Sequence, residues 1–266
     1  MSPVEVRRGN SPVVLGVPHT GTDVTDDIRA RLNDEGLKLR DTDWHIDLLY
    51  DGLLPDATKV RATFHRYVVD ANRDPGGTSL YPGQATTPLV SPTDFDNQPI
   101  WRDGMAPDDA EIARRVKLFH APYHAALSAE IARVKAIHGV VILYDCHSIR
   151  SRVPYLFEGT LPDFNIGTDC GRTCDPPVEL AARAVCETAD GYSSVVNGRF
   201  RGGWTTRHYA APGEGVHTIQ MELAQSTHLA SETPPYAYDE TRAARLRPVL
   251  AELLRRLEAL APALKG

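Results

Sequence analysis

Two histidines closely follow apolar runs in this chain of 266 residues. His19 comes after the run 12–17 and a proline, and His147 comes after the run 140–144 and an Asp-Cys pair. Short apolar runs of this kind are typical of buried strands. Because α/β sheets gather their chemistry at the carboxyl ends of strands, we expect the two imidazoles to converge on one metal ion.

A carboxylate is the expected third ligand of this site, since catalytic zinc usually takes three protein ligands and keeps one position open. We predict Asp43 for this role, although an aspartate at such a place can instead cap a helix. His45 and Asp47 are the alternatives. Asp145 lies two residues before His147 and therefore on the same face of the predicted strand. From there it can orient the ligand histidine from behind.

Glu222 lies late in the apolar run 216–223. A buried carboxylate is costly unless it is paired or functional. We therefore predict that Glu222 is a general base, which takes a proton from the attacking water. The alternative is a structural glutamate in a salt bridge.

Several arginines stand near polar turns, and these are Arg66, Arg73, Arg199, Arg201 and Arg207. A guanidinium group binds a carboxylate through two hydrogen bonds, and it also stabilises an oxyanion. Several of them around one metal site would indicate an anionic substrate.

The composition narrows the class of protein. The formal net charge is −6 and no basic run is present, so we do not expect a nucleic-acid partner. No apolar stretch approaches the roughly 20 residues that a membrane-spanning helix needs, and residues 1–5 lack the apolar core of a signal peptide. We expect a cytoplasmic protein with a small-molecule substrate. The sequence does not decide its oligomeric state.

Strand and helix signals alternate along the chain. Helical spacing and capping signals predict helices over about 24–35, 44–54, 107–138, 177–189 and 239–260. Apolar or alternating runs predict strands over 12–17, 60–71, 140–144, 194–197 and 216–223. Two stretches, 74–107 and 150–176, are rich in loop residues, and the first is long enough to form a lid or wall.

This alternation predicts an α/β fold with a mixed, mainly parallel sheet flanked by helices on both faces. No internal repeat and no low-complexity linker divides the sequence. We therefore expect residues 1–266 to form a single catalytic domain, which is within the size that one core can support.

Seven short motifs are spread over nearly the whole length of the chain. They are residues 18–21 (Pro-His-Thr-Gly), 41–45 (Asp-Thr-Asp-Trp-His), 145–151 (Asp-Cys-His-Ser-Ile-Arg-Ser), 161–168, 197–203, 206–209 and 222–226. In these motifs, taken together, the chain resembles the N-formylglutamate deformylase family, also called N-formylglutamate amidohydrolase.

The chain is also similar to the zinc carboxypeptidase superfamily, including aspartoacylase and succinylglutamate desuccinylase. Residues 70–73, Asp-Ala-Asn-Arg, resemble the Asp-Leu-Asn-Arg with which those deacylases bind a substrate carboxylate. The resemblance implies a zinc-exopeptidase-like, phosphorylase/hydrolase-like fold, with Arg66 polarising the scissile carbonyl and Glu222 as the catalytic glutamate. The usual His-x-x-Glu motif is absent, because Thr22 stands at that spacing, and Asp43 is expected to replace its carboxylate.

Residues and resemblance together predict an enzyme that hydrolyses N-formyl-L-glutamate to L-glutamate and formate, a step of histidine degradation. The expected cofactor is Zn²⁺ or another divalent metal held by His19, Asp43 and His147, and Glu222 and Arg66 are the expected catalytic residues. The expected substrate-binding residues are Asn72, Arg73, Arg199 and Arg207.

Other functions stay open at this point. The chain could be a related zinc deacylase or carboxypeptidase for another N-acyl amino acid, or a non-catalytic binder of acidic amino acids. It could also be a metal-free hydrolase with Cys146 or Ser148 as nucleophile. Cys170 and Cys174 form a C-x3-C pair that could hold a structural zinc, but ordinary thiols are favoured, since no second Cys/His pair has matching spacing.

Overall fold

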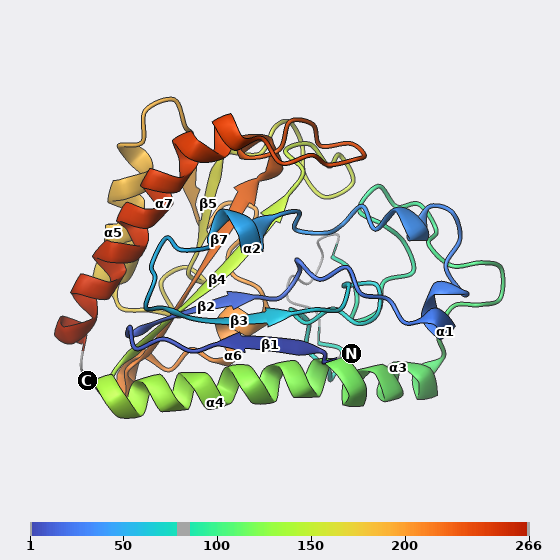
Figure 1. Ribbon diagram of the computed structural model, residues 1–266, viewed down its shortest axis with the longest axis horizontal. Helices are drawn as coiled ribbons and strands as arrows, with labels where there is room; N and C mark the ends of the chain where they lie inside the picture. Colours follow the sequence, from blue (N-terminus) through green and yellow to red (C-terminus); the bar gives the residue numbers. More distant parts are fainter. Residues whose placement is uncertain (1, 79–85, 265–266) are drawn as a thin grey trace.

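The computed structural model describes residues 2–78 and 86–264. In this part of the chain the strands are β1 (Val4–Arg7), β2 (Val13–Val17), β3 (Thr58–Ala62), β4 (Val141–Ile149), β5 (Phe164–Gly167), β6 (Ser194–Val196) and β7 (Val216–Ala224). They lie side by side in the order β1-β3-β2-β4-β7-β5-β6, and Figure 1 labels the run from β1 to β5 in this order.

The centre of the sheet is parallel. β3, β2, β4 and β7 pair in parallel, and so do β5 and β6. β1 is antiparallel to β3, and β5 is antiparallel to β7. The predicted mixed, mainly parallel sheet is therefore confirmed. β4 and β7 are buried along their whole length, as expected for parallel strands that are covered on both faces.

The α-helices are α1 (Asp26–Arg29), α2 (Ile46–Leu49), α3 (Asp109–Arg115), α4 (Ala121–His138), α5 (Pro176–Glu187), α6 (Trp204–His208) and α7 (Glu240–Leu260). A π-helical turn, η2 (Val116–His120), joins α3 to α4. Short 3₁₀ turns are η1 (Gly36–Lys38), η3 (Pro212–Glu214), η4 (Gln225–Thr227) and η5 (Ala261–Leu264).

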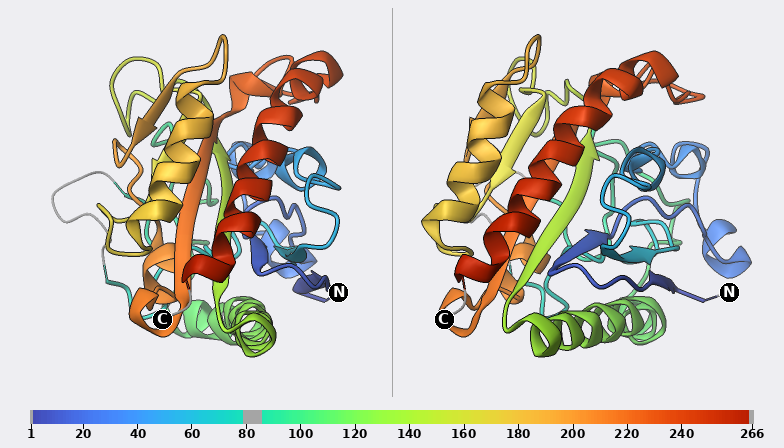
Figure 2. Two further views of the ribbon diagram at one scale, coloured as in Figure 1. Left: turned by 90° about the vertical axis from the view of Figure 1, so that its left-hand side faces the viewer. Right: turned by 60° about the vertical axis from the view of Figure 1, so that its left-hand side comes forward.

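Helices cover both faces of the sheet (Figures 1 and 2). α4 packs on one face, in a core that includes Val14 and Leu143. α5 and α7 pack on the other face, in a core that includes Leu15 and Ile142. Neighbouring residues of one strand thus pack into cores on opposite faces of the sheet, because side chains alternate in direction along a strand. Within residues 2–78 and 86–264, none of the helices combines the length and apolarity needed to cross a bilayer.

Several predicted elements are shorter than their patterns indicate. The helices expected over 24–35 and 44–54 are the single turns α1 and α2, and the strand expected over 60–71 ends at Ala62. Apolar residues beyond these ends, such as Leu32, Tyr67 and Val69, are nevertheless buried. The spacing of these apolar residues therefore reflects burial in irregular segments and not a continuous helix or strand.

Three observed elements are absent from the sequence prediction. β1 is an edge strand of four residues, most of them exposed, and its Val-Glu-Val-Arg alternation is too short to predict a strand by itself. β5 lies inside 150–176, which the loop-rich composition predicted to be irregular. α6 has five residues, which is too few to show helical periodicity.

Candidate active site

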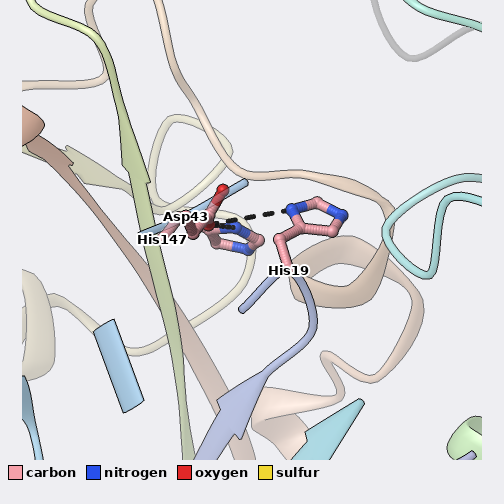
Figure 3. Close-up of side chains that lie close together, drawn as sticks. All are labelled: His19, Asp43 and His147. Carbon is pink, nitrogen blue, oxygen red and sulfur yellow. Dashed lines mark hydrogen bonds and ion pairs between the residues drawn. The ribbon is translucent and has the colours of Figure 1, made fainter. Parts of the chain in front are cut away.

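Three buried side chains from distant parts of the chain meet at the carboxyl edge of the sheet (Figure 3). His19 follows β2, His147 lies in β4, and Asp43 lies just before α2. Asp43 Oδ2 is 3.2 Å from His147 Nδ1 and 3.8 Å from His19 Nδ1. The backbone N–H of Asp43 donates to the His19 carbonyl oxygen at 3.0 Å. This bond fixes the loop that carries Asp43 against the end of β2.

Each histidine also contacts a second buried carboxylate. His19 Nε2 lies 2.7 Å from Asp70 Oδ1, and His147 Nε2 lies 3.1 Å from Asp145 Oδ2. Each ring therefore turns Nδ1 toward Asp43 and Nε2 toward an orienting carboxylate, the arrangement that fixes a ligand histidine. The predicted contact of Asp145 with His147 is confirmed. The contact of Asp70 with His19 is new, since it joins residues 51 positions apart.

The donor set fits a divalent ion. The ligand atoms of His19, Asp43 and His147 all lie within 4.8 Å of one another. Atoms about 2.0–2.2 Å from a tetrahedral zinc are about 3.3–3.6 Å apart, close to the 3.2 Å and 3.8 Å that separate Asp43 Oδ2 from the two rings. The buried carboxylates of Asp70 and Asp145 add negative charge beside them. An ion there would offset charge that is costly to bury.

Burial and the neighbouring charged groups shift the pKa values of His19 and His147 in opposite directions. Burial and then the Arg66 guanidinium lower the pKa of His19, so its neutral ring can offer a lone pair at Nδ1. At His147, burial disfavours the charged ring, but the Asp145 and Asp43 carboxylates outweigh it and raise the pKa well above its usual value. The site therefore attracts positive charge to the space beside Asp43.

Glu222 lies beside this group. It is the partner of His147 in the register of β4 and β7. Its side chain is buried, and burial, together with the Asp43 carboxylate, raises the pKa of Glu222 to about 8. A carboxyl group that exchanges its proton near neutral pH is suited to general acid–base catalysis.

All these side chains except the two orienting aspartates line one cavity, the kind of concave site in which small molecules bind. Arg66, Arg73 and Arg199 are the arginines among the described residues that line it. Arg66 is buried, pairs with Asp70 at 2.6 Å, and lies over the Phe95 ring at 4.7 Å from its centroid.

Asn72 and Arg207 differ in their position. Asn72 lines the cavity, where its Nδ2 is 3.1 Å from His147 Nε2 and its Oδ1 accepts from the Thr205 N–H at 2.8 Å. Arg207 is not among the described lining residues. Its guanidinium pairs with Asp169 at 3.1 Å. The structure thus does not bring Arg207 to the cavity, because α6 directs it elsewhere.

The alternative third ligands have other partners. His45 Nε2 contacts the carbonyl oxygen of Tyr236 at 2.9 Å, and Asp47 lies 3.7 Å from the Arg61 guanidinium. Neither joins the donor group found among the described residues. The geometry therefore favours Asp43 as the carboxylate of the group.

The cysteines lie outside this chemistry. Cys146 is fully buried in the core that contains α5 and α7, and burial raises its pKa well above the usual value, which disfavours a thiolate nucleophile. Ser148 lines the cavity, but in the described structure its hydroxyl contacts Gln225 rather than a histidine. Cys170 is exposed and Cys174 is buried, and neither belongs to the described donor group.

A mixed α/β sheet that carries two histidines, an aspartate and a buried glutamate at its carboxyl edge has the layout of a hydrolase that activates water. Comparison with known proteins identifies the family. A family model described as N-formylglutamate amidohydrolase matches residues 11–229. The chain is 46% identical over 252 residues to the N-formylglutamate deformylase of Pseudomonas aeruginosa, with 94% of each chain covered. The chain therefore belongs to the N-formylglutamate amidohydrolase family.

Further relatives agree with this assignment. The N-formylglutamate deformylase of Pseudomonas putida is 43% identical over 251 residues, which cover 94% of this chain and 93% of the relative. The crystal structure of an N-formylglutamate amidohydrolase from Ralstonia eutropha has a TM-score of 0.78 at 25% identity, covering 96% of this chain and 97% of the other. A protein from Agrobacterium tumefaciens, with a TM-score of 0.75 at 20% identity over 98% and 96% of the two chains, shares the fold.

Proposed function

We propose that this chain hydrolyses N-formyl-L-glutamate to formate and L-glutamate, as the names of its Pseudomonas relatives describe for them. The observation that carries the proposal is the cavity itself. It joins a donor group for a cation, a buried glutamate and the guanidinium groups of Arg66, Arg73 and Arg199. A small substrate with a reactive amide and two carboxylates matches these three features. The whole chain would then act as one catalytic domain.

His19, Asp43 and His147 would hold a zinc or another divalent ion. Such an ion would supply Lewis acidity to the site. Asp70 and Asp145 would keep the two rings turned with Nδ1 toward the ion, because each contacts Nε2 of its histidine.

Glu222 would move the proton. It would accept a proton from the water that attacks the formyl carbon, and it would return that proton to the nitrogen when the C–N bond breaks. Arg66 lines the same cavity and would stabilise the negative charge that develops on the formyl oxygen. One water is consumed, and formate and glutamate are released.

Arg73 and Arg199 would bind the carboxylates of the glutamate part. Arg73 is braced by hydrogen bonds from its guanidinium to the carbonyl oxygen of Thr87 at 2.7 Å and to the Thr87 hydroxyl at 2.8 Å. Arg199 is braced by a bond from its Nε to the Leu156 carbonyl oxygen at 2.8 Å. Held guanidinium groups lose little freedom on binding, which favours a doubly charged substrate.

The test compares acyl groups on one amino acid. The purified chain, loaded with zinc, would be supplied with N-formyl-, N-acetyl- and N-succinyl-glutamate at equal concentrations, and released glutamate would be measured. We expect the formyl compound to have the highest kcat/KM and treatment with a chelator to abolish its turnover. A higher kcat/KM for the acetyl or succinyl compound would replace the proposal with another deacylase, and undiminished turnover after verified metal removal would reject the ion.

A further inference from the structure

The side chain of Gln220 lies between the proposed base and the main chain of Gly203. Its Oε1 accepts from the Gly203 N–H at 2.6 Å, and its Nε2 donates to Glu222 Oε2 at 3.1 Å. Gln220 is buried and lines the cavity. A backbone N–H can only donate, so it determines which end of the carboxamide faces it. The NH₂ group is therefore directed to Glu222.

The register of the two central strands repeats this arrangement. His147 is paired with Glu222, and two residues earlier Asp145 is paired with Gln220. In each strand the earlier residue contacts the later one at 3.1 Å, Asp145 with His147 and Gln220 with Glu222. Residues two apart share a face of the sheet. A row of orienting side chains thus lies directly behind the row of functional side chains.

Residue 203 must be a glycine because the Asn72 side chain packs directly against its Cα. A Cβ atom there would lie 2.2 Å from Asn72 Nδ2 and 2.5 Å from Asn72 Oδ1. Asn72 is oriented in the same way as Gln220, since its Oδ1 accepts from the Thr205 N–H and its Nδ2 faces His147. The backbone around Gly203 thus sets two carboxamides, each of which faces a residue of the proposed machinery.

We propose that Gln220 is a positioning residue for Glu222, an inference that rests on the proposed function. Its NH₂ group holds Glu222 Oε2 and so sets the carboxyl plane. This leaves Oε1 as the oxygen that accepts the proton from water and returns it to the leaving nitrogen. Without the amide, Glu222 would adopt other rotamers, and fewer molecules would hold it in the reactive geometry.

The test uses two replacements of similar size. Gln220→Met and Gln220→Leu each remove the amide that donates to Glu222, and both leave an apolar side chain in its place. Asn165→Leu is the matched control, because Asn165 is equally buried and bonds the main-chain carbonyl of Glu222 at 3.0 Å rather than its side chain. Metal content and the unfolding midpoint would be measured for every variant.

We expect both Gln220 variants to lose about 10- to 100-fold in kcat, the range that corresponds to one hydrogen bond to a charged group. KM for N-formylglutamate should change less than about threefold, and the metal content should not change. When Gln220→Met is added to Glu222→Gln, kcat should fall by less than about threefold further, because the effect of Gln220 passes through the Glu222 carboxylate.

Other outcomes would overturn the inference. A kcat within about threefold of the unmodified chain in Gln220→Met would mean that the donor has no role, and Gln220→Leu decides if Gln220→Met does not fold. Equal losses with and without the Glu222 carboxylate, or an equal loss in Asn165→Leu, would assign Gln220 to packing alone. If the unmodified chain fails to release glutamate, the proposed function itself fails, and the inference fails with it.

Discussion

Each imidazole of the site turns one nitrogen toward Asp43 and the other toward a buried aspartate. We expect His19→Ala and His147→Ala to lose most of the bound metal and at least about 100-fold in kcat, since each removes a direct ligand. Asp70→Asn removes the charge that orients His19 and pairs with Arg66, but no direct ligand, and it should weaken metal binding by about 10- to 100-fold. The measurements are metal per chain after dialysis and kcat.

His138→Ala is the matched control for these replacements, because this histidine bonds the Asn10 carbonyl oxygen at 2.8 Å and lies outside the donor group. It should retain full metal. A full metal complement in both His19→Ala and His147→Ala would remove these ligands from the proposal.

Glu222 allows a separate test of proton transfer. Glu222→Gln keeps the size of the side chain and should bind metal and substrate nearly normally. It should lose at least about 100-fold in kcat, the lower end for a general acid–base group. Turnover and substrate binding would be measured separately. Loss of the metal or of the fold in this variant would assign Glu222 a ligand or structural role instead.

Arg73 carries the prediction on substrate charge. Because a carboxylate forms a charge-assisted, hydrogen-bonded pair with a guanidinium group and a neutral amide does not, N-formylglutamine should have a much lower kcat/KM than N-formylglutamate, about 100-fold or more. Arg73→Met should reduce this preference mainly by harming the acidic substrate. Arg207→Met is the control, since its guanidinium pairs with Asp169, and it should keep the preference. Equal kcat/KM of the unmodified chain for N-formylglutamate and N-formylleucine would indicate a general deformylase.

At the scale of elements, the helical stretch from α3 to α4 braces the wall of the site. Its π-helical turn ends at His120. His120 Nε2 lies 3.0 Å from the Arg73 carbonyl oxygen, and His124 Nε2 lies 2.7 Å from that of Ala71. Burial lowers the pKa of both rings, that of His124 to about 3. Neutral rings with a proton on Nε2 can therefore hold the backbone on either side of Asn72.

Glu111 anchors the first turns of this stretch. The hydrogen bond from Arg114 lowers the pKa of Glu111 to about 2, with a further bond from the buried Arg115. Since this value is below the ordinary 4.5, its stabilisation is complete above about pH 4.5 and is lost as the pH falls toward 2. Glu111→Gln should reduce the free energy of unfolding by about 1–3 kcal/mol at pH 7 and by less at pH 3.

Urea unfolding at the two pH values measures this effect. Glu158→Gln is the control, because Glu158 is exposed, and it should change stability little at either pH. A loss in Glu111→Gln that is the same at pH 7 and pH 3 would contradict the role of the charge.

At the scale of the whole molecule, a bound ion would join three distant segments. The donor group takes one residue each from the end of β2, the loop before α2, and β4. An ion at about 100 times its dissociation constant adds about 2.7 kcal/mol of stability, so chelation should lower the unfolding midpoint by about 5–10 °C. Asp43→Asn should respond much less to the chelator. An unchanged midpoint in the unmodified chain would argue against a tightly held ion.

The amino-acid sequence by itself determined the elements whose signals are local. β2, β7, α5 and α7 lie close to their predicted ranges, and α3, η2 and α4 together fill the helix predicted over 107–138, because uninterrupted apolar runs and helical periodicity indicate burial directly. β4 begins near its predicted start but continues to Ile149, so His147 lies within the strand rather than after it. The same signals marked His19, His147 and Glu222 as polar groups at or near the ends of buried strands. The α/β class followed from the alternation of these elements.

Tertiary structure alone decided which polar groups meet. The sequence favoured Asp43 but left His45 and Asp47 as alternatives, and the bond from the Asp43 N–H to the His19 carbonyl oxygen places Asp43 beside the histidines. The contact of Asp70 with His19 and the separation of Arg207 from the cavity depend on paths of loops and of α6. Periodicity describes neighbours along one element, whereas a site is made by residues that only the folded chain brings together.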